Sequence, residues 1–370
     1  MVALDIIFYI FVAIVFIQLF YYLIFLRTFA FLKSEHPQKK DIPVSVIVCA
    51  KNEEENLKQF LPSILNQEYS NFEVVLINDA SHDDTLSVFE NFSEQYNNIK
   101  IVNVKNTEAF WANKKYALTL GIKAAKHNHL LFTDADCKPV SNTWISEITA
   151  AFDNNKSIVL GYGSYSKEKK SFLNKLIRFE TVLTASQYFS YAKLGMPYMG
   201  VGRNLAYTKP LFFEANGFIN HMKVSSGDDD LFVNQMATSK NTALCFTPES
   251  ITESVPKKSF SAWIKQKRRH VSTVSHYKKI HKFLLGLFYI SQLLFWIVGI
   301  VLISLLYKWE IVVGLFALRI LVQWIVMGKS AKKLNESDLL PLIPFLEIFV
   351  ILTQLTIFIS NKISKPHTWK

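Results

Sequence analysis

Four long apolar runs constrain this chain more than any other feature. The first, Ile6 to Leu26, has 21 residues and no charged side chain. A helix needs about 20 apolar residues to cross the hydrocarbon core of a bilayer, so we expect a transmembrane anchor within residues 1–30. A cleaved signal peptide is the alternative. It is disfavoured because the run is long, is preceded by Asp5 rather than a positive charge, and lacks a small-x-small cleavage site.

The other three apolar runs lie in residues 283–370 and predict further transmembrane helices. They cover approximately residues 283–307, 309–328 and 339–360. Pro341 and Pro344 weaken the start of the last run, so a re-entrant or interfacial helix is the alternative there.

Two charges interrupt the last two runs, and their spacing predicts an ion pair. Arg319 and Glu347 are each 14 residues from position 333, which lies in the connection between the runs. In an antiparallel hairpin they would stand at the same depth. Because isolated charges inside a membrane are costly, we expect these two side chains to pair.

Positive residues near the ends of the runs predict the orientation of the chain. They fall on one side if the middle domain, residues 31–282, is cytoplasmic: Lys33, Lys39, Lys40, Lys278, Lys279, Lys282, Lys329, Lys332 and Lys333. A third C-terminal crossing would place Lys362, Lys365 and Lys370 on the opposite side, which conflicts with this rule. We expect an integral protein of the cell or inner membrane.

The middle domain alternates between short β-branched runs and helical patterns. We expect strands at Val44–Cys49, Glu73–Asn78, Ile99–Val104 and His129–Thr133. We expect helices at Glu53–Asn66, Asp83–Tyr96 and Asn113–Lys126. This order predicts an α/β fold with a parallel sheet covered by helices on both faces.

Polar residues follow the strands, where such sheets bind ligands. They are Lys51, Asn52 and Glu53 after the first strand, Asp79 after the second, and Asp134 and Asp136 after the fourth. Gly161 and Gly163 lack the third glycine of a dinucleotide motif, and no P-loop occurs. Asp134 and Asp136 point the same way in an extended segment, which suits a divalent cation carrying diphosphate oxygens.

Composition excludes several classes of protein. Half of the residues are apolar, which excludes a disordered chain. The three cysteines, Cys49, Cys137 and Cys245, show no zinc or disulfide pattern. The net charge of +11 allows a nucleic-acid-binding membrane protein, but no nucleic-acid-binding motif supports it. A transporter is also possible, although apolar helices with few polar breaks make a poor substrate pathway.

At this point several segments, in order, resemble the membrane-bound family 2 glycosyltransferases of the GT-A fold. The resemblance covers about residues 43–270 and rests on segments 45–54, 77–85, 113–118, 132–136, 200–204, 226–231 and 266–270. It departs from the family pattern at Asn113 (for Gly), Gly227 (for Glu) and His270 (for Trp). The resemblance implies a Rossmann-like mixed sheet with helices on both faces, in addition to the transmembrane helices. It also implies a nucleotide half at about 43–136 and an acceptor half at about 137–270.

The resemblance also implies roles for particular residues. Asp228 would be the general base of an inverting transfer, and Asp136 with Asp134 would hold Mg²⁺ or Mn²⁺. Donor and nucleotide binding would fall to Asn52, Glu53, Asp79, Lys114, Asp134 and Arg269. Acceptor or diphosphate contacts would fall to Arg203, Asn204, Asp229, Asp230, Gln266 and His270.

Each of these roles has a structural alternative. Asp79 could cap the following helix, and two of Asp228, Asp229 and Asp230 could be ordinary helix-start residues. Trp111 and Trp144 are expected to pack rather than to bind sugar. Three aromatic residues could line an acceptor groove, although core packing is the default: Phe189, Tyr191 and Tyr198.

The implied partners are a nucleotide-sugar donor, expected to be a UDP-sugar, a lipid or glycan acceptor and the bilayer, but no nucleic acid. Whether one sugar is transferred or a polysaccharide is extruded processively stays open. Residues 257–282 supply +9 of the net +11 without a single acidic residue. Anionic headgroups attract such residues at about 1 kcal/mol each, so we expect this segment at the membrane surface.

Overall fold

A computed structural model describes residues 2–33, 38–105 and 114–364 of the chain. Asn113, Trp111, Lys365 and Lys370, which the sequence analysis considered, lie outside these ranges. The chain divides into two compact units. The helical unit contains residues 2–32, 169–190 and 258–364, and the α/β unit contains residues 33–168 and 191–257 within the described ranges.

The helical unit contains four helices that are long and apolar enough to cross a membrane. They are α1 (Val2–Phe25), α10 (Lys279–Ser304), α11 (Trp309–Lys333) and α12 (Ile343–Ile363). A π-helical turn, η1 (Leu26–Ala30), continues α1, and a 3-10 turn, η6 (Ser337–Leu342), precedes α12. Pro341 lies in that turn and Pro344 in the first turn of α12, where the missing N–H costs nothing. The prolines therefore set the start of the last helix and do not interrupt it.

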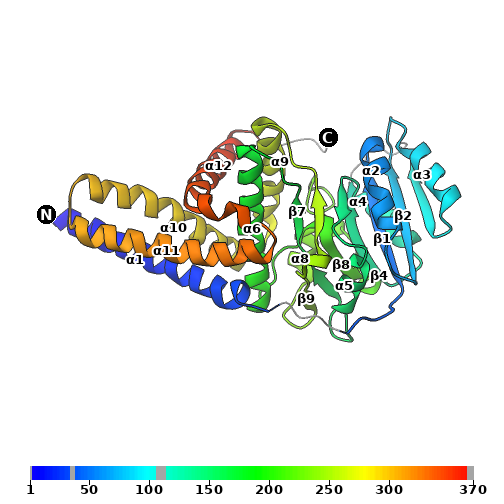
Figure 1. The fold of residues 1–370 in the computed structure, drawn as a ribbon, viewed down its shortest axis with the longest axis horizontal. Helices are drawn as coiled ribbons and strands as arrows, with labels where there is room; N and C mark the ends of the chain where they lie inside the picture. The colour runs from blue at the N-terminus through cyan, green and yellow to red at the C-terminus, as the bar shows by residue number, and fades with distance from the viewer. Residues whose placement is uncertain (1, 34–37, 106–113, 365–370) are drawn as a thin grey trace. The chain divides into compact units, whose positions relative to one another are not determined.

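Helices α1, α10 and α11 pack side by side (Figure 1). Phe295 of α10 stacks between Phe11 and Phe316, with ring centroids 5.9 and 4.4 Å away. At Gly299 of α10, a Cβ would lie 2.8 Å from the Phe316 ring, so only glycine allows this approach. The three helices thus share an aromatic core.

The predicted pair of Arg319 and Glu347 is confirmed. The guanidinium of Arg319 donates from Nη1 to Glu347 Oε2 and from Nη2 to Glu347 Oε1, both at 2.6 Å. Arg319 also donates to Gln18 Oε1 at 2.7 Å, and Gln292 donates to Glu347 Oε1 at 2.8 Å. Residues of all four long helices meet in this buried polar cluster: Gln18, Tyr22, Gln292, Arg319, Gln323 and Glu347.

Two further helices belong to the helical unit although their sequence lies inside the predicted middle domain. They are α6 (Phe172–Lys193), except for its last turn, and α9 (Phe260–Ser272), which runs into η5 (Thr273–His276). The buried guanidinium of Arg178 in α6 pairs with Glu336 and Asp338 beside η6. These ion pairs explain why the division of the chain differs from the single boundary expected at residue 282.

The α/β unit is built on a seven-stranded mixed sheet with the order β3-β2-β1-β4-β8-β6-β9. The four parallel strands are those predicted: β1 (Val44–Ala50), β2 (Phe72–Asp79), β3 (Ile99–Val104) and β4 (His129–Asp134). The strands that extend the sheet are β8 (Leu205–Thr208), β6 (Ile158–Leu160) and β9 (Thr242–Leu244). Strand β8 runs antiparallel to both β4 and β6, so the sheet is mixed.

Helices cover both faces of this sheet, as the nearly continuous burial of its central strands β1, β2 and β4 requires. Val44, Val46 and Val48 of β1 pack against apolar residues of α2 (Glu54–Leu65), α3 (Thr85–Gln95) and α5 (Trp144–Ala150). Helix α4 (Lys114–Ala124) covers the other face. Its Gly121 packs directly on Ile77, because a Cβ there would lie 2.1 Å from Ile77 Cδ1. The three predicted helices are thus present over the described residues.

A small second sheet stands beside the first, with the order β5-β10-β7. Its strands are β5 (Cys137–Pro139), β10 (Thr252–Ser254) and β7 (Gly163–Tyr165). The remaining short elements of the unit are η2 (Gly202–Asn204), α7 (Lys209–Glu214), η3 (Ile219–His221), α8 (Asp230–Met236) and η4 (Pro248–Ser250). Because β5 follows β4 after two residues, the Asp134 to Cys137 turn joins the two sheets.

Candidate active site

The carboxyl ends of three parallel strands lie level with one another. Cys49 of β1 is paired in register with Ile77 of β2 and with Asp134 of β4. The polar residues that follow these strands therefore gather at one edge of the sheet, as predicted.

The loops after β1 and β2 are hydrogen-bonded to each other. The Asn52 N–H donates to Ser81 Oγ at 3.0 Å, and the His82 N–H donates to Asn52 Oδ1 at 2.8 Å. The Glu53 N–H donates to Thr85 Oγ1, also at 3.0 Å. Asn52 has φ +56°, a left-handed conformation that asparagine tolerates. Asn52 and Glu53 thus join two loops into one wall of the site.

Asp79 ends β2 and is almost completely buried. Burial raises the pKa of its carboxyl, while Lys51 and Lys114 oppose that shift. Lys51 Nζ lies 4.0 Å from Asp79 Oδ2. Helix α3 begins six residues later at Thr85, with Asp84 at its cap position, so Asp79 does not cap that helix.

Asp134, Asp136 and Cys137 form a group whose ligand atoms all lie within 4.8 Å of one another. The Cys137 thiol donates to Asp136 Oδ1 at 3.4 Å, and burial raises its pKa well above the ordinary value. A neutral thiol is a poor metal ligand, so the two carboxylates are the donors this group offers. Two carboxylates fit a hard cation such as Mg²⁺ or Mn²⁺, and the group is compatible with metal binding.

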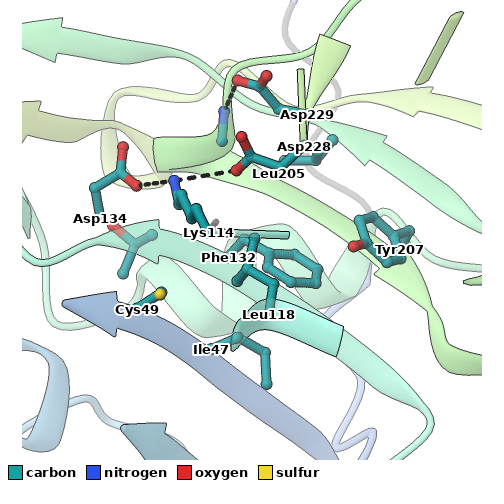
Figure 2. Close-up of a pocket in the computed structure, with 12 residues that line it drawn as sticks. Ile47, Cys49, Lys114, Leu118, Phe132, Asp134, Leu205, Tyr207, Asp228 and Asp229 are labelled. Atoms are coloured by element: carbon teal, nitrogen blue, oxygen red, sulfur yellow. Dashed lines mark hydrogen bonds and ion pairs between the residues drawn. The ribbon is translucent and has the colours of Figure 1, made fainter. Parts of the chain in front are cut away.

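Lys114, at the start of α4, bridges two acidic segments (Figure 2). Its Nζ lies 2.9 Å from Asp134 Oδ1 and 3.1 Å from Asp228 Oδ2. Burial lowers the pKa of Lys114, but the two carboxylates outweigh burial and raise it well above its ordinary value. For Asp228, burial acts to raise the pKa of the carboxyl, but the charge and hydrogen bond of Lys114 outweigh burial. The pKa of Asp228 is therefore lowered from its ordinary value. Both groups are therefore ionised in this arrangement.

Asp229 and Asp230 differ from Asp228 in their contacts. Asp229 accepts from the Gly202 N–H through Oδ2 and from the Asp230 N–H through Oδ1, both at 2.7 Å. It caps α8, and Asp230 is the first residue of that helix. Burial, followed by the charges of Asp228 and Asp230, raises the pKa of Asp229 to about 7. The alternative of helix-start residues therefore describes Asp229 and Asp230.

Gly227 explains one departure from the family pattern. It has φ +92°, and a Cβ at this position would lie 2.6 Å from Leu231 Cγ and Cδ1. A glutamate could not adopt this backbone without strain. The glycine that replaces the expected Glu is thus required by the local fold.

Arg203 and Asn204 make contacts inside the α/β unit, and their expected acceptor or diphosphate contacts stay a prediction from the resemblance. Asn204 is completely buried and its amide is used inside the unit: it donates to Tyr162 O and Ser250 O and accepts from Trp144 Nε1. The Arg203 guanidinium lies 4.2 Å from the centre of the Tyr165 ring and donates to Gly163 O at 2.7 Å.

The close approach of Arg203 and Asn204 also explains Gly161 and Gly163. A Cβ at either glycine would lie within 2.5 Å of one of these side chains. The two glycines make room for packing, in agreement with the rejection of a dinucleotide motif. Phe189, Tyr191 and Tyr198 are buried, which agrees with the core packing expected of them by default, and Trp144 is buried as well.

Three predicted site residues lie in the helical unit. Gln266, Arg269 and His270 are on α9. On the same helix, Lys267 pairs with Glu180, and Arg268 donates to Asn361 Oδ1 at 2.9 Å near the end of α12. The roles of Gln266, Arg269 and His270 stay predictions from the resemblance.

The sequence analysis missed Lys115, which neighbours Lys114. This ammonium is buried and donates to three backbone carbonyls of the segment before Asp228. Burial lowers its pKa to about 8, against the charges of the three aspartates. A buried lysine beside an expected functional lysine carries no sequence signal of its own.

Comparison with known proteins supports the GT-A-like fold and the glycosyltransferase class that the resemblance implied. Residues 45–216 match the family described as Glycosyl transferase family 2. An uncharacterized glycosyltransferase of Haemophilus influenzae is 35% identical over 147 residues, which are 39% of this chain and 41% of that protein. The poly-beta-1,6-N-acetyl-D-glucosamine synthase of Staphylococcus epidermidis is 34% identical over 104 residues, which are 28% of this chain and 24% of the synthase.

A solved structure resembles most of the chain. The mannosyltransferase PcManGT from Pyrobaculum calidifontis, in complex with GDP-Man and Mn²⁺, aligns with 93% of this chain and 99% of its own at a TM-score of 0.61 and 19% identity. The GT-A-like fold predicted for the α/β unit is thereby confirmed. The family match ends before Asp228, so the proposed base rests on the resemblance and on the local geometry.

Proposed function

Because residues 45–216 are a glycosyl transferase family 2 domain, we propose that this chain transfers a sugar from a nucleotide-sugar donor to a membrane-associated lipid or glycan acceptor, with inversion at the anomeric carbon. The observation that carries the proposal is the acidic cluster at the sheet edge. There, Lys114 joins Asp134, a member of the potential metal group, to Asp228.

The donor would lie along the joined loops after β1 and β2. Asp79, buried at the end of β2, would accept a hydrogen bond from the base, and uracil supplies the imide donor for it. Asn52 and Glu53 would shape the nucleotide wall. Asp134 and Asp136 would hold Mg²⁺ or Mn²⁺ against the diphosphate. When bound, such a cation neutralises charge that develops on the leaving diphosphate.

Asp228 would accept the proton of the acceptor hydroxyl as that oxygen attacks the anomeric carbon. The bond to the diphosphate oxygen breaks on the opposite face, which inverts the configuration. Lys114 keeps Asp228 ionised before the reaction. It would turn toward the diphosphate as charge develops there, which frees Asp228 to take the proton.

The acceptor would reach this site from a membrane. The four long apolar helices fit a membrane protein, and residues 257–282 carry the concentrated positive charge described above. We propose an integral protein of the cell or inner membrane with the α/β unit in the cytoplasm, where nucleotide sugars are made and where the basic residues at the helix ends are favoured.

The test is a donor screen on membranes that contain the full chain. A panel of UDP- and GDP-sugars is incubated with Mg²⁺ or Mn²⁺, and extracted lipids and glycans are analysed by mass spectrometry. We expect one donor to give a product one sugar heavier than its acceptor, with loss of product in EDTA and in Asp136→Asn. Absence of metal-dependent nucleotide release from a folded preparation with every donor would refute the proposal.

A processive polysaccharide synthase is the alternative product class. Residues 266–269 resemble a motif of such synthases, and one relative is named as a poly-N-acetylglucosamine synthase. The mass spectrum distinguishes the two products, because a processive enzyme gives a ladder of masses and a single transfer gives one increment.

A further inference from the structure

Lys115 points its ammonium into the segment that leads to Asp228. The Nζ donates to His221 O at 2.7 Å, Val224 O at 2.9 Å and Ser226 O at 2.7 Å. The side chain is buried, with 2% of the residue exposed. An ammonium has three N–H donors, and all three are used here on the backbone of one segment.

That segment has no regular structure to fix its shape. Residues 222–229, all of them described, contain neither a helix nor a strand and connect η3 to α8. Three hydrogen bonds that support their conformation converge on one side chain of α4, which is distant in sequence. Hydrogen bonds from a charged donor contribute more than those between neutral groups, so this ammonium is a strong anchor.

The anchored segment ends at the reacting group. Ser226, the last residue held by Lys115, is followed by Gly227 in its left-handed conformation and then by Asp228. From the adjacent position of α4, Lys114 pairs with the Asp228 carboxylate. Of these two adjacent lysines of α4, Lys115 therefore holds the backbone before Asp228, and Lys114 holds the Asp228 carboxylate.

We propose that Lys115 is a positioning residue for the transfer reaction: by gathering the carbonyl groups of His221, Val224 and Ser226, it sets the position of Asp228. This inference rests on the proposed function of Asp228 as the base. A displacement of about 1 Å in a reacting group can lower the rate about 100-fold. Loss of one side chain that anchors the backbone before Asp228 is therefore expected to lower the rate of transfer.

The test compares Lys115→Met with a matched control in the full chain in detergent micelles. Methionine keeps the length and the apolar stem of lysine but donates no hydrogen bond. The control is Lys209→Met, because Lys209 Nζ also donates to backbone carbonyls, those of Lys123 and Ala125, on the far end of α4. Both variants lose a lysine–carbonyl anchor, but one anchor lies next to Asp228.

We expect Lys115→Met to lower kcat about 10- to 100-fold while the donor KM and the affinity for the nucleoside diphosphate with Mn²⁺ change less than about 2-fold. Lys209→Met should leave all three within about 2-fold, and Lys115→Arg should recover part of kcat. An unchanged kcat in folded Lys115→Met overturns the proposal. Equal losses of kcat and nucleotide affinity in both methionine variants also overturn it, because they indicate general destabilisation.

A second readout does not depend on activity. Lys223 is exposed in the anchored segment and is a trypsin site. Cleavage after Lys223 should be at least about 10-fold faster in Lys115→Met than in the wild type or in Lys209→Met, and equal rates contradict the anchoring. If Lys115→Met does not fold, Lys115→Gln, which keeps two N–H donors, takes its place. A wild type that transfers no sugar refutes the proposed function, while proteolysis still decides whether Lys115 holds this segment.

Discussion

The two units of this protein each contain a cluster of buried charges, and the clusters differ in how completely they are matched. In the helical unit, Arg319 and Glu347 make a two-point pair, and their side chains are 0% and 1% exposed. In the α/β unit, Lys114 makes single contacts to Asp134 and Asp228, and the Asp134 side chain is 37% exposed.

The balance of charge differs as well. One guanidinium meets one carboxylate in the helical unit, and neutral amides of Gln18 and Gln292 complete the network. At the sheet edge, several carboxylates surround few cations. A closed, balanced pair is complete without a ligand, whereas an open site with excess negative charge is suited to an incoming cation. This contrast separates a structural cluster from a functional one.

The largest effect should come from the open cluster, measured as activity. Asp228→Asn keeps the size of the side chain but removes the base, so we expect transfer to fall about 10²- to 10⁴-fold. The midpoint of thermal unfolding should change little, because Lys114 keeps Asp134 as its partner. Asp153→Asn, an exposed acidic residue in a turn of the same unit, is the control and should keep full activity. A fully active Asp228→Asn enzyme would exclude Asp228 as the base.

Substitutions in the closed Arg319–Glu347 cluster should change the stability of the protein rather than its activity. Arg319→Met leaves the Glu347 carboxylate buried and unpaired, so we expect a loss of about 3–5 kcal/mol in the free energy of unfolding in micelles. The folded fraction should transfer sugar at the wild-type rate. The exchanged variant, Arg319→Glu with Glu347→Arg, should recover about half of that loss. Strictly additive losses in the exchanged variant would show that the two residues act independently.

The last expected effect is a pH dependence of stability at Asp229. Its pKa in the folded protein is about 7, against about 3.9 for an unfolded aspartate. The folded state therefore binds more protons between these values, and stability falls as the pH rises through this window. Asp229→Asn should remove this fall. Thermal unfolding of both proteins between pH 4 and pH 8 checks it; parallel curves would contradict the raised pKa.

Much of the fold was predictable because local patterns carry it. The four parallel strands have β-branched runs bounded by polar residues, and the structure places them within two residues of the predicted ends. The Arg319–Glu347 pair followed from helical rise and equal spacing about position 333. The antiparallel strand β8 was not predicted, because its pairing with β4 and β6 depends on contacts distant in sequence.

The site was predictable at its strand ends and less so elsewhere. Asp79, Asp134 and Asp136 follow strands whose ends must meet, whereas Asn204 is buried by Trp144 and Ser250, which no local pattern connects to it. Lys114 and Lys115 differ by one position on α4, yet one contacts carboxylates and the other backbone carbonyls. Sequence alone does not decide which of two adjacent lysines faces which segment.

The hydrogen bonds between the loops after β1 and β2 have a consequence for engineering. Asn52 contacts both Ser81 and His82, so a substitution in one loop changes the support of the other. To transfer the donor preference of a relative to this protein, both loops would have to be replaced together. In a library that randomises positions 52, 81 and 82, active clones should show correlated choices, and recombining loops from different clones should lose activity.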